Sequence, residues 1–195
     1  MYSKERAQQI TKNDIKYIPA GIQENVALKG ARVATSPNGN VFLEITLEKD
    51  GATLPRTEWK PTKFGTMTDE DVQKKEDNQF SRMMQILLCF YKDEELIFNS
   101  STFEGWAKEV ADYLNKADKS KLVRVKIVYD NKGYTTLPSY AKYTFIEPMT
   151  VSKENSAIVE LGIDNFTRPI IADNEEIVDS LKVTTNEENP NDLPF

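Results

Sequence analysis

The sequence predicts a mainly β domain of the α+β class, in which a helical segment separates an early set of strands from a later set. Apolar and polar residues alternate in the early strands, and the same period-2 pattern returns after residue 122. Between these regions apolar residues recur at helical spacing, as on one face of an amphipathic helix. After residue 172 the periodicity ends and acidic, polar residues dominate, which is typical of disorder.

Three strands are expected in the early region. The first, 26–35, contains Gly30, which indicates a bulge or a sharp bend. The stretch 36–40 holds Pro-Asn-Gly and favours a tight turn, because proline presets one dihedral angle and Asn-Gly tolerates positive φ. A half-buried strand with strict alternation follows at 41–48, and a third strand, 53–60, completes a meander.

Two helices are expected next. The first, 69–92, starts with a capping-box pattern at Thr68 and Asp71, and the second starts near Ser101. Their apolar faces are interpreted as core; they are formed by Phe80, Met83, Met84, Leu87, Leu88 and Tyr91 on the first helix and by Phe103, Trp106, Val110, Leu114 and Ala117 on the second. Cys89 lies on the first of these faces and is interpreted as a buried thiol.

Strand periodicity returns at 123–129, followed by a hairpin turn at 130–133. The segment 134–137 leads towards a strand at 143–146, and the apolar run 158–163 could add one more. This order of three strands, a helical insertion and two or three further strands predicts an OB-like five-stranded barrel. Its helices would lie between strands 3 and 4. Other small barrels and α+β folds share this order.

The expected organisation is an amino-terminal arm (1–20), an OB-like domain (21–172) and a disordered acidic tail (173–195). The tail contains seven of the 31 acidic residues but only one of the 25 basic residues. Residues 1–172 therefore carry 24 acidic and 24 basic residues. The whole net charge of −6 therefore lies in the tail, and a basic groove on the neutral body is permitted.

The composition argues against an enzyme. The chain has no histidine, which removes the commonest general base and transition-metal ligand, and its single cysteine cannot hold zinc. Asp69, Asp71, Glu76 and Asp77 could be imagined as a magnesium cluster, but acids that complement the helix dipole explain them more simply. No cofactor or metal is expected. The sequence shows neither a membrane span nor a signal peptide, so a cytoplasmic protein is expected.

Aromatic and basic residues interleave on the expected strands and their loops. Flat rings for base stacking and cations for phosphates are what binding of single-stranded nucleic acid requires. The candidate DNA contacts are Arg32, Phe42, Arg56, Trp59, Lys60, Lys63, Tyr129, Lys132, Tyr134, Tyr140, Lys142 and Tyr143. Any single ring could equally pack the barrel. Phe42 is a better candidate than most, although Glu44 and Glu48 share its face.

The carboxyl-terminal residues Asp192, Leu193, Pro194 and Phe195 place an apolar tip at the end of the acidic tail. Such a tip can fill a pocket on a partner while its carboxylate meets a basic side chain. The alternative is a tail that only aids solubility. This ending resembles the tails of single-stranded DNA-binding proteins, and the long helical insertion looks more like their bacteriophage members than the tetrameric bacterial type.

That resemblance implies a protein that coats single-stranded DNA during phage replication or recombination and recruits a polymerase, helicase or nuclease through its tail. Self-association is permitted. One alternative is a structural or protein-interaction phage protein whose β-core binds another chain and whose tail is a docking peptide. Another is a carboxylate-dependent nuclease, which would need about three acids converging beside the barrel.

Overall fold

The computed structural model describes residues 17–169 and confirms a mainly β fold with helices inserted between two groups of strands. The expected tail and most of the expected arm lie outside the described residues. The elements are β1 (Gly21–Thr35), β2 (Val41–Lys49), β3 (Ala52–Trp59), α2 (Asp69–Leu87), α3 (Phe103–Lys116), β4 (Leu122–Tyr129), β5 (Thr135–Thr136) and β6 (Ile146–Pro148), with 3₁₀ turns at Asp93–Glu95 and Lys153–Asn155.

The six strands form one antiparallel sheet in which β1 is shared between two partners. The strand order is β3-β2-β1-β4-β5, and β6 also pairs with β4. The first half of β1 pairs with β4, as Gly21 does with Ile127, whereas the second half pairs with β2, as Thr35 does with Val41. Register shifts interrupt β1 at two places, one of them beside Gly30, so the predicted irregularity there is confirmed.

The sheet has six strands and is not closed, so the expected five-stranded barrel is not observed. β3 and β5 lie near each other, but the described strands show no backbone pairing between them. Arg56 on β3 spans the gap instead: its Nη1 donates to the carbonyl oxygen of Leu137 (3.1 Å) and lies 3.4 Å from Thr136 Oγ1. β5 is two residues long and offers too few backbone groups for a longer ladder.

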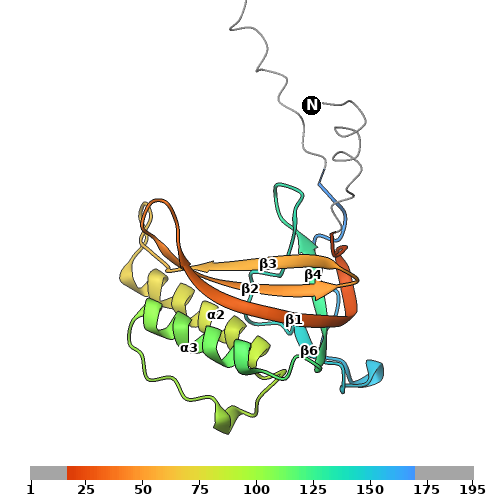
Figure 1. Cartoon of the computed structure of the whole chain (residues 1–195). Helices are drawn as coiled ribbons and strands as arrows, with labels where there is room; N and C mark the ends of the chain where they lie inside the picture. Colours follow the sequence, from red (N-terminus) through yellow and green to blue (C-terminus); the bar gives the residue numbers. More distant parts are fainter. Residues whose placement is uncertain (1–16, 170–195) are drawn as a thin grey trace, which may run out of the picture.

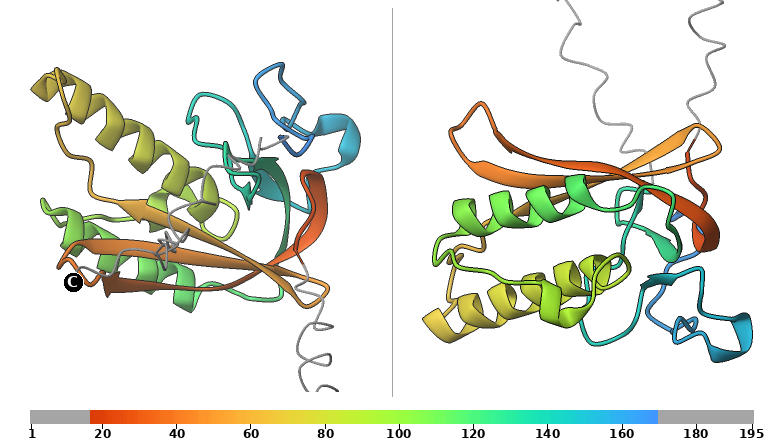
Figure 2. Two further views of the ribbon diagram at one scale, coloured as in Figure 1. Left: turned by 90° about the horizontal axis from the view of Figure 1, so that it is seen from above. Right: turned by 60° about the horizontal axis from the view of Figure 1, so that its bottom comes forward.

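Both helices cover one face of the β1–β2–β3 sheet, the lower face in Figure 1. Figure 2 shows α2 and α3 running beside each other on that face. Leu43, Ile45 and Leu47 of β2 are buried, and they form the core with the apolar faces of the helices. Phe42 and Glu44 alternate with them and therefore point to the opposite face, which the helices leave uncovered.

The first helix begins as predicted but is shorter. Thr68 and Asp71 form the predicted capping box: the Thr68 hydroxyl accepts from the Asp71 N–H (3.2 Å), and the Asp71 carboxylate accepts from the Thr68 N–H (2.9 Å). The helix predicted over 69–92 ends at Leu87, and a tight turn follows from which Cys89 and Phe90 enter the core while Leu88 stays exposed. Cys89 is buried in that turn, as predicted, and burial raises the pKa of its thiol to about 12.

Two further boundaries differ from the predictions. The run 158–163 is irregular and not a strand: Ile158 is buried, but Val159 and Ile163 are exposed. The strand predicted at 143–146 is found at 146–148. Ile18, predicted to lie in the arm, is 1% exposed and belongs to the core, whereas its neighbours Tyr17 and Pro19 are exposed.

Candidate nucleic-acid interface

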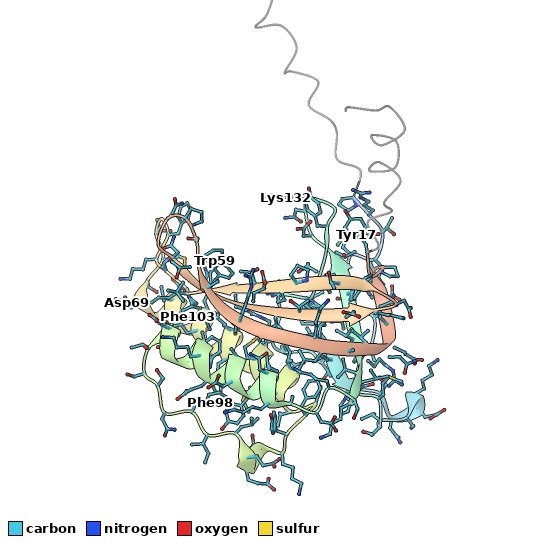
Figure 3. All side chains as sticks on the ribbon, in the orientation of Figure 1. Tyr17, Trp59, Asp69, Phe98, Phe103 and Lys132 are labelled. Atoms are coloured by element: carbon cyan, nitrogen blue, oxygen red, sulfur yellow. The ribbon has the colours of Figure 1, made fainter. Side chains whose placement is uncertain are left out.

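Phe42 and Trp59 form an aromatic pair on the uncovered face of the sheet. They are direct neighbours in the register of β2 and β3, and their ring centroids lie 4.7 Å apart. Trp59 remains 46% exposed, because the helices lie on the other face of the sheet. Figure 3 places Trp59 on the side of the sheet opposite Phe98. The pair therefore offers exposed ring surface to a ligand, although each ring also packs against the other.

The loop from β3 to α2 extends this surface. Lys60 and Lys63 are exposed there, and Lys63 Nζ pairs with Asp69 Oδ1 at 2.7 Å. Phe64 is 84% exposed and precedes Gly65, whose φ of 58° fits a turn. Phe64 was absent from the predicted site. The signal that could have found it is a single phenylalanine in a polar loop, where no periodicity assigns it to a core.

Arg56 occupies a different environment from the one predicted for it. It was expected to contact phosphate, but it lies on the inner side of β3, and its Nε pairs with Glu58 Oε1 at 2.9 Å. Glu58 also receives Arg82 of α2, with Nη2 2.9 Å from Oε2, and Gln79 donates to the same Oε2 at 2.9 Å. Arg56 and Glu58 are two positions apart and share a face of β3, which is the face the helices cover.

The carboxylate of Glu58 is 4% exposed and stays ionised because cations surround it. Burial alone would raise its pKa, but Arg56 and Arg82, helped by a hydrogen bond from Gln79, hold the pKa below its ordinary value. A buried charge with several partners fixes geometry, since removing any partner leaves another buried charge uncompensated. This cluster therefore sets the position of β3 relative to α2.

A polar edge of α2 aligns the end of β3 with the later loop 137–145. Gln79 donates to the carbonyl oxygen of Trp59 (2.9 Å), and Arg82 donates to the carbonyl oxygen of Ser139 (2.8 Å). Gln85 donates to the carbonyl oxygens of Ala141 (2.9 Å) and Tyr143 (3.3 Å) and accepts from the Phe145 N–H (3.2 Å).

These three helix positions are spaced at i, i+3 and i+6. At a rise of ~1.5 Å per residue they span about 9 Å along the helix axis. Segments far apart in the sequence are therefore held along one line.

The loop 137–145 carries the second aromatic group of the candidate interface. Tyr140 and Tyr143 pack edge to face with centroids 5.6 Å apart, and Lys142 Nζ lies 5.7 Å from the centre of the Tyr143 ring. Tyr143 is 39% exposed, and Lys142 is exposed. These two side chains can meet a ligand from solvent.

Tyr140 has a structural role in addition to its ring contacts. Its hydroxyl donates to Asp164 Oδ1 at 2.9 Å and lies 2.9 Å from Lys126 Nζ, whose ammonium also pairs with Asp164 Oδ2 at 2.6 Å. Burial and the hydrogen bond to Asp164 raise the pKa of Tyr140. The predicted DNA contact is therefore corrected at this residue: its polar end is used inside the protein, and it supports Tyr143.

The β4–β5 hairpin presents the third group. The carboxylate of Asp130 accepts from the N–H groups of Lys132 and Tyr134, both at 2.9 Å, which fixes the predicted turn. Tyr134 is 60% exposed and Lys132 is exposed, while Tyr129 is half-buried at the base of the hairpin. Figure 3 shows Lys132 on the same side of the sheet as Trp59.

Arg32 is on the uncovered face but is already neutralised. Its Nε pairs with Glu44 Oε1 at 2.7 Å across β1 and β2, and Lys29 pairs with Glu48 at 2.9 Å beside it. The cations that form no ion pair in the described part of the site are Lys60, Lys132 and Lys142. Of the predicted residues, therefore, the rings of Phe42, Trp59, Tyr134 and Tyr143 and these three lysines offer accessible groups.

Residues 17–169 contain no group of three His, Cys, Asp or Glu side chains that could hold a metal ion. In the same range no helix is long and apolar enough to cross a membrane. The predicted partner-binding residues Asp192, Leu193, Pro194 and Phe195 lie outside the described residues.

Comparison of the sequence with protein-family models and with curated proteins finds no match.

Proposed function

We propose that this protein binds single-stranded DNA along the uncovered face of its sheet and performs no chemistry on it. The observation that carries the proposal is the pair of half-buried Phe42 and exposed Trp59, with the exposed Lys60 beside it. A base can stack on an exposed ring whatever its identity, and each stacked base contributes ~1–3 kcal/mol. A duplex hides the faces of its bases, so an exposed ring favours single strands.

The proposed path leaves the open face at the β3 edge of the sheet, where α2 holds the later loop beside the end of β3. It runs from Trp59 past the loop holding Lys142 and Tyr143 to the hairpin with Lys132 and Tyr134. Rings and lysines alternate along this path, which suits a chain of alternating bases and phosphates. Phe64 extends the path on the side of the β3–α2 loop.

The sheet is proposed to be an open variant of an OB-like barrel. The sharing of β1 between β2 and β4, the helices between β3 and β4, and the Arg56 bridge from β3 to the β5 region support this interpretation. In OB-folds the ligand lies on the face of strands 2 and 3, between the loops that join strands 1 and 2 and strands 4 and 5. On this interpretation, Phe42 and Trp59 correspond to that face and Lys132 to the loop that joins strands 4 and 5.

The test is a titration with oligo-dT and with duplex DNA of equal length at two salt concentrations. A Trp106→Phe variant leaves Trp59 as the only tryptophan of the chain, so quenching reports the proposed contact directly. We expect quenching by oligo-dT at affinities that fall with rising salt, because phosphate contacts release counterions. Equal affinity for duplex and single strand, or DNA binding without quenching, would contradict the proposal and favour a protein-interaction role for this face.

The role in phage replication or recombination, with partner recruitment by the tail, is proposed from the resemblance of its last residues. Phe195→Ala keeps all seven tail acids but removes the apolar tip. We expect it to abolish docking to replication proteins in a pull-down while leaving single-strand binding unchanged. Deletion of 173–195 should in addition tighten DNA binding at low salt, since the acids compete with phosphates for the same lysines. If the Phe195→Ala variant retains all its partners, the tail acts only as a solubilising segment.

A further inference from the structure

A cleft of about 450 Å³ lies between α2, α3 and the segment before α3, and four rings line it: Phe80, Phe98, Phe103 and Trp106. The sequence assigned Phe80, Phe103 and Trp106 to the core, but Phe80 is 40% exposed and the other two are half-buried. The rings are inclined to one another, by 74° for Phe80 and Phe98 and by 45° for Phe103 and Trp106. They therefore form several walls of a site whose volume suits a small planar ligand.

Trp106 also carries a polar atom without a partner. Its indole Nε1 is shielded from solvent and has no hydrogen-bond acceptor within the described residues. Such groups are rare in folded proteins, because a shielded donor without an acceptor is costly. An occupant that brings an acceptor atom to this N–H would remove that cost.

Two carboxylates of α2 line the cleft, those of Glu76 and Asp77. Glu76 precedes Phe80 by four positions, so this carboxylate and this ring share one face of the helix. Asp77 Oδ1 accepts from Gln73 Nε2 at 2.9 Å, and neither carboxylate forms an ion pair within residues 17–169. Ionised carboxylates accept hydrogen bonds and donate none, so the occupant has to supply donors to them.

The charge around these two carboxylates is largely balanced. Asp69 pairs with Lys63 at 2.7 Å and Glu104 pairs with Lys108 at 2.7 Å. Glu70 pairs in the same way with a lysine one turn later on α2. Lys60 lines the cleft itself. A polyanion can therefore approach the mouth of the cleft, where this lysine meets a phosphate.

The cleft is continuous with the Trp59 surface. Lys60 follows Trp59 in the chain and lines the cleft, and Gln79, another lining residue, donates to the carbonyl oxygen of Trp59 at 2.9 Å. Figure 3 shows Trp59 and Phe103 at the same end of the sheet. A strand that stacks on Trp59 and contacts Lys60 therefore passes the mouth of the cleft.

We propose that the cleft takes one base of the bound strand and selects a base with an exocyclic amino group, which is cytosine, adenine or guanine. This inference rests on the proposed single-strand binding. The amino group donates to Glu76 or Asp77, as amino groups of bases do to acidic side chains elsewhere. A ring nitrogen or carbonyl oxygen of the same base accepts from Trp106 Nε1, and the rings of the cleft contact its faces.

Thymine does not fit this arrangement. It has no amino group, and its carbonyl oxygens are acceptors that the carboxylates repel. An all-thymine strand therefore binds through the Trp59 surface alone, and the cleft adds a preference at one position of a mixed strand.

The test compares an all-thymine oligonucleotide with the same oligonucleotide in which one central thymine is replaced by 5-methylcytosine. The two bases share ring size and methyl group, but 5-methylcytosine has an amino group where thymine has a carbonyl oxygen. We expect binding about fivefold or more tighter for the oligonucleotide with 5-methylcytosine, measured by competition against a labelled strand. In Trp59→Phe, which leaves Trp106 as the only tryptophan, this oligonucleotide should change the emission and the all-thymine one should not.

Three variants connect the preference to the cleft. Glu76→Gln/Asp77→Asn should reduce it to about twofold or less, because an amide both donates and accepts and so tolerates thymine. Trp106→Phe should reduce it as well, since the ring remains but the donor is lost. Both variants should keep the affinity for the all-thymine strand. The matched control is Glu104→Gln, which removes a carboxylate beside the cleft that is already paired with Lys108, and it should keep the full preference.

The outcomes separate this inference from the proposed function. If neither oligonucleotide binds, single-strand binding fails and this inference fails with it. If both bind with equal affinity, or if the preference survives in all three variants, this inference alone is overturned. A Trp106 emission that changes without DNA would also overturn it: a change with protein concentration places a second copy in the cleft, and a change in Lys12→Glu/Lys16→Glu places the chain's own segment there.

Discussion

Trp59 and Trp106 are the two tryptophans of the chain, and their surroundings differ in charge. Trp59 pairs with Phe42 on the open face of the sheet, next to the exposed Lys60. Trp106 contacts Phe80 and Phe103 in a cleft whose charged lining residues are Glu76, Asp77 and Lys60. Both sites offer aromatic surface, so rings alone do not decide what binds. The exposed lysine beside Trp59 supports the proposed phosphate contact, whereas the cleft around Trp106 places two acids against one base.

The two sites also differ in how they are supported. The Trp59 surface rests on a buried ion cluster, since Gln79 bonds both to Glu58 and to the carbonyl of Trp59. Glu58→Ala leaves Arg56 and Arg82 without their counter-charge, and we expect a loss of ~3–5 kcal/mol of unfolding free energy. Urea denaturation measures this loss of unfolding free energy. The matched control is Glu44→Ala, which removes the partner of the exposed Arg32 and should cost about 0–1 kcal/mol. Similar costs for both variants would refute the role given to the cluster.

The next effect separates the two tryptophans in DNA binding. Trp59→Ala should weaken oligo-dT binding by ~1–3 kcal/mol, because one stacked base loses its ring. Trp106→Phe keeps a ring in the cleft and should leave the affinity unchanged. Fluorescence anisotropy with a labelled oligonucleotide measures both. If Trp106→Phe weakens binding as much as Trp59→Ala, the assignment of DNA to the sheet face is wrong.

The lysines sharpen the same comparison through salt dependence. Substituting Lys60, Lys132 or Lys142 by alanine should each lower the slope of log affinity against log salt by ~0.7, the value for one phosphate contact with a single strand. Lys108 on α3 pairs with Glu104 at 2.7 Å and lies outside the proposed path, so Lys108→Ala should not change the slope. Affinities measured at four or more salt concentrations determine the slope of each variant. If none of the three substitutions changes the slope, these lysines do not contact the DNA.

The smallest expected effect is an acid dependence of stability. The pKa of Glu58 is below its ordinary value of 4.5 in the folded protein, so the folded state keeps the carboxylate ionised where the unfolded state protonates. The stabilisation is fully present above pH 4.5 and is lost as the pH falls through the folded pKa. Unfolding free energies between pH 6 and pH 3 should therefore fall more in the natural protein than in Glu58→Gln. Parallel curves would mean that other carboxylates govern acid unfolding.

The sequence predicted those features that depend on local patterns. The turn at Gly39, the irregularity at Gly30, the capping box at Thr68 and the alternation of β2 are set by neighbouring residues, and all are found. Helix length was overestimated, because Cys89 continues the apolar pattern from a turn. Local patterns cannot distinguish a helix from a buried turn that follows it.

The positions of polar residues could not be predicted in this way. Arg56 looked like a phosphate contact, but its role depends on Arg82 and Leu137, which only the tertiary structure brings near. The same is true of Tyr140, whose partner Asp164 lies 24 positions away. Phe80 looked like core because helical periodicity reports which face is apolar, and it does not report whether a neighbouring element covers that face.

The division of β1 between two partner strands has a consequence for the order of folding. Its second half meets β2 through a short turn, so that pairing is local and rapid. Its first half meets β4 only after roughly 100 further residues, including both helices, have joined the chain. During synthesis the edge from Gly21 to Val26 therefore has no partner strand until β4 emerges. Closing that long loop is expected to limit the folding rate.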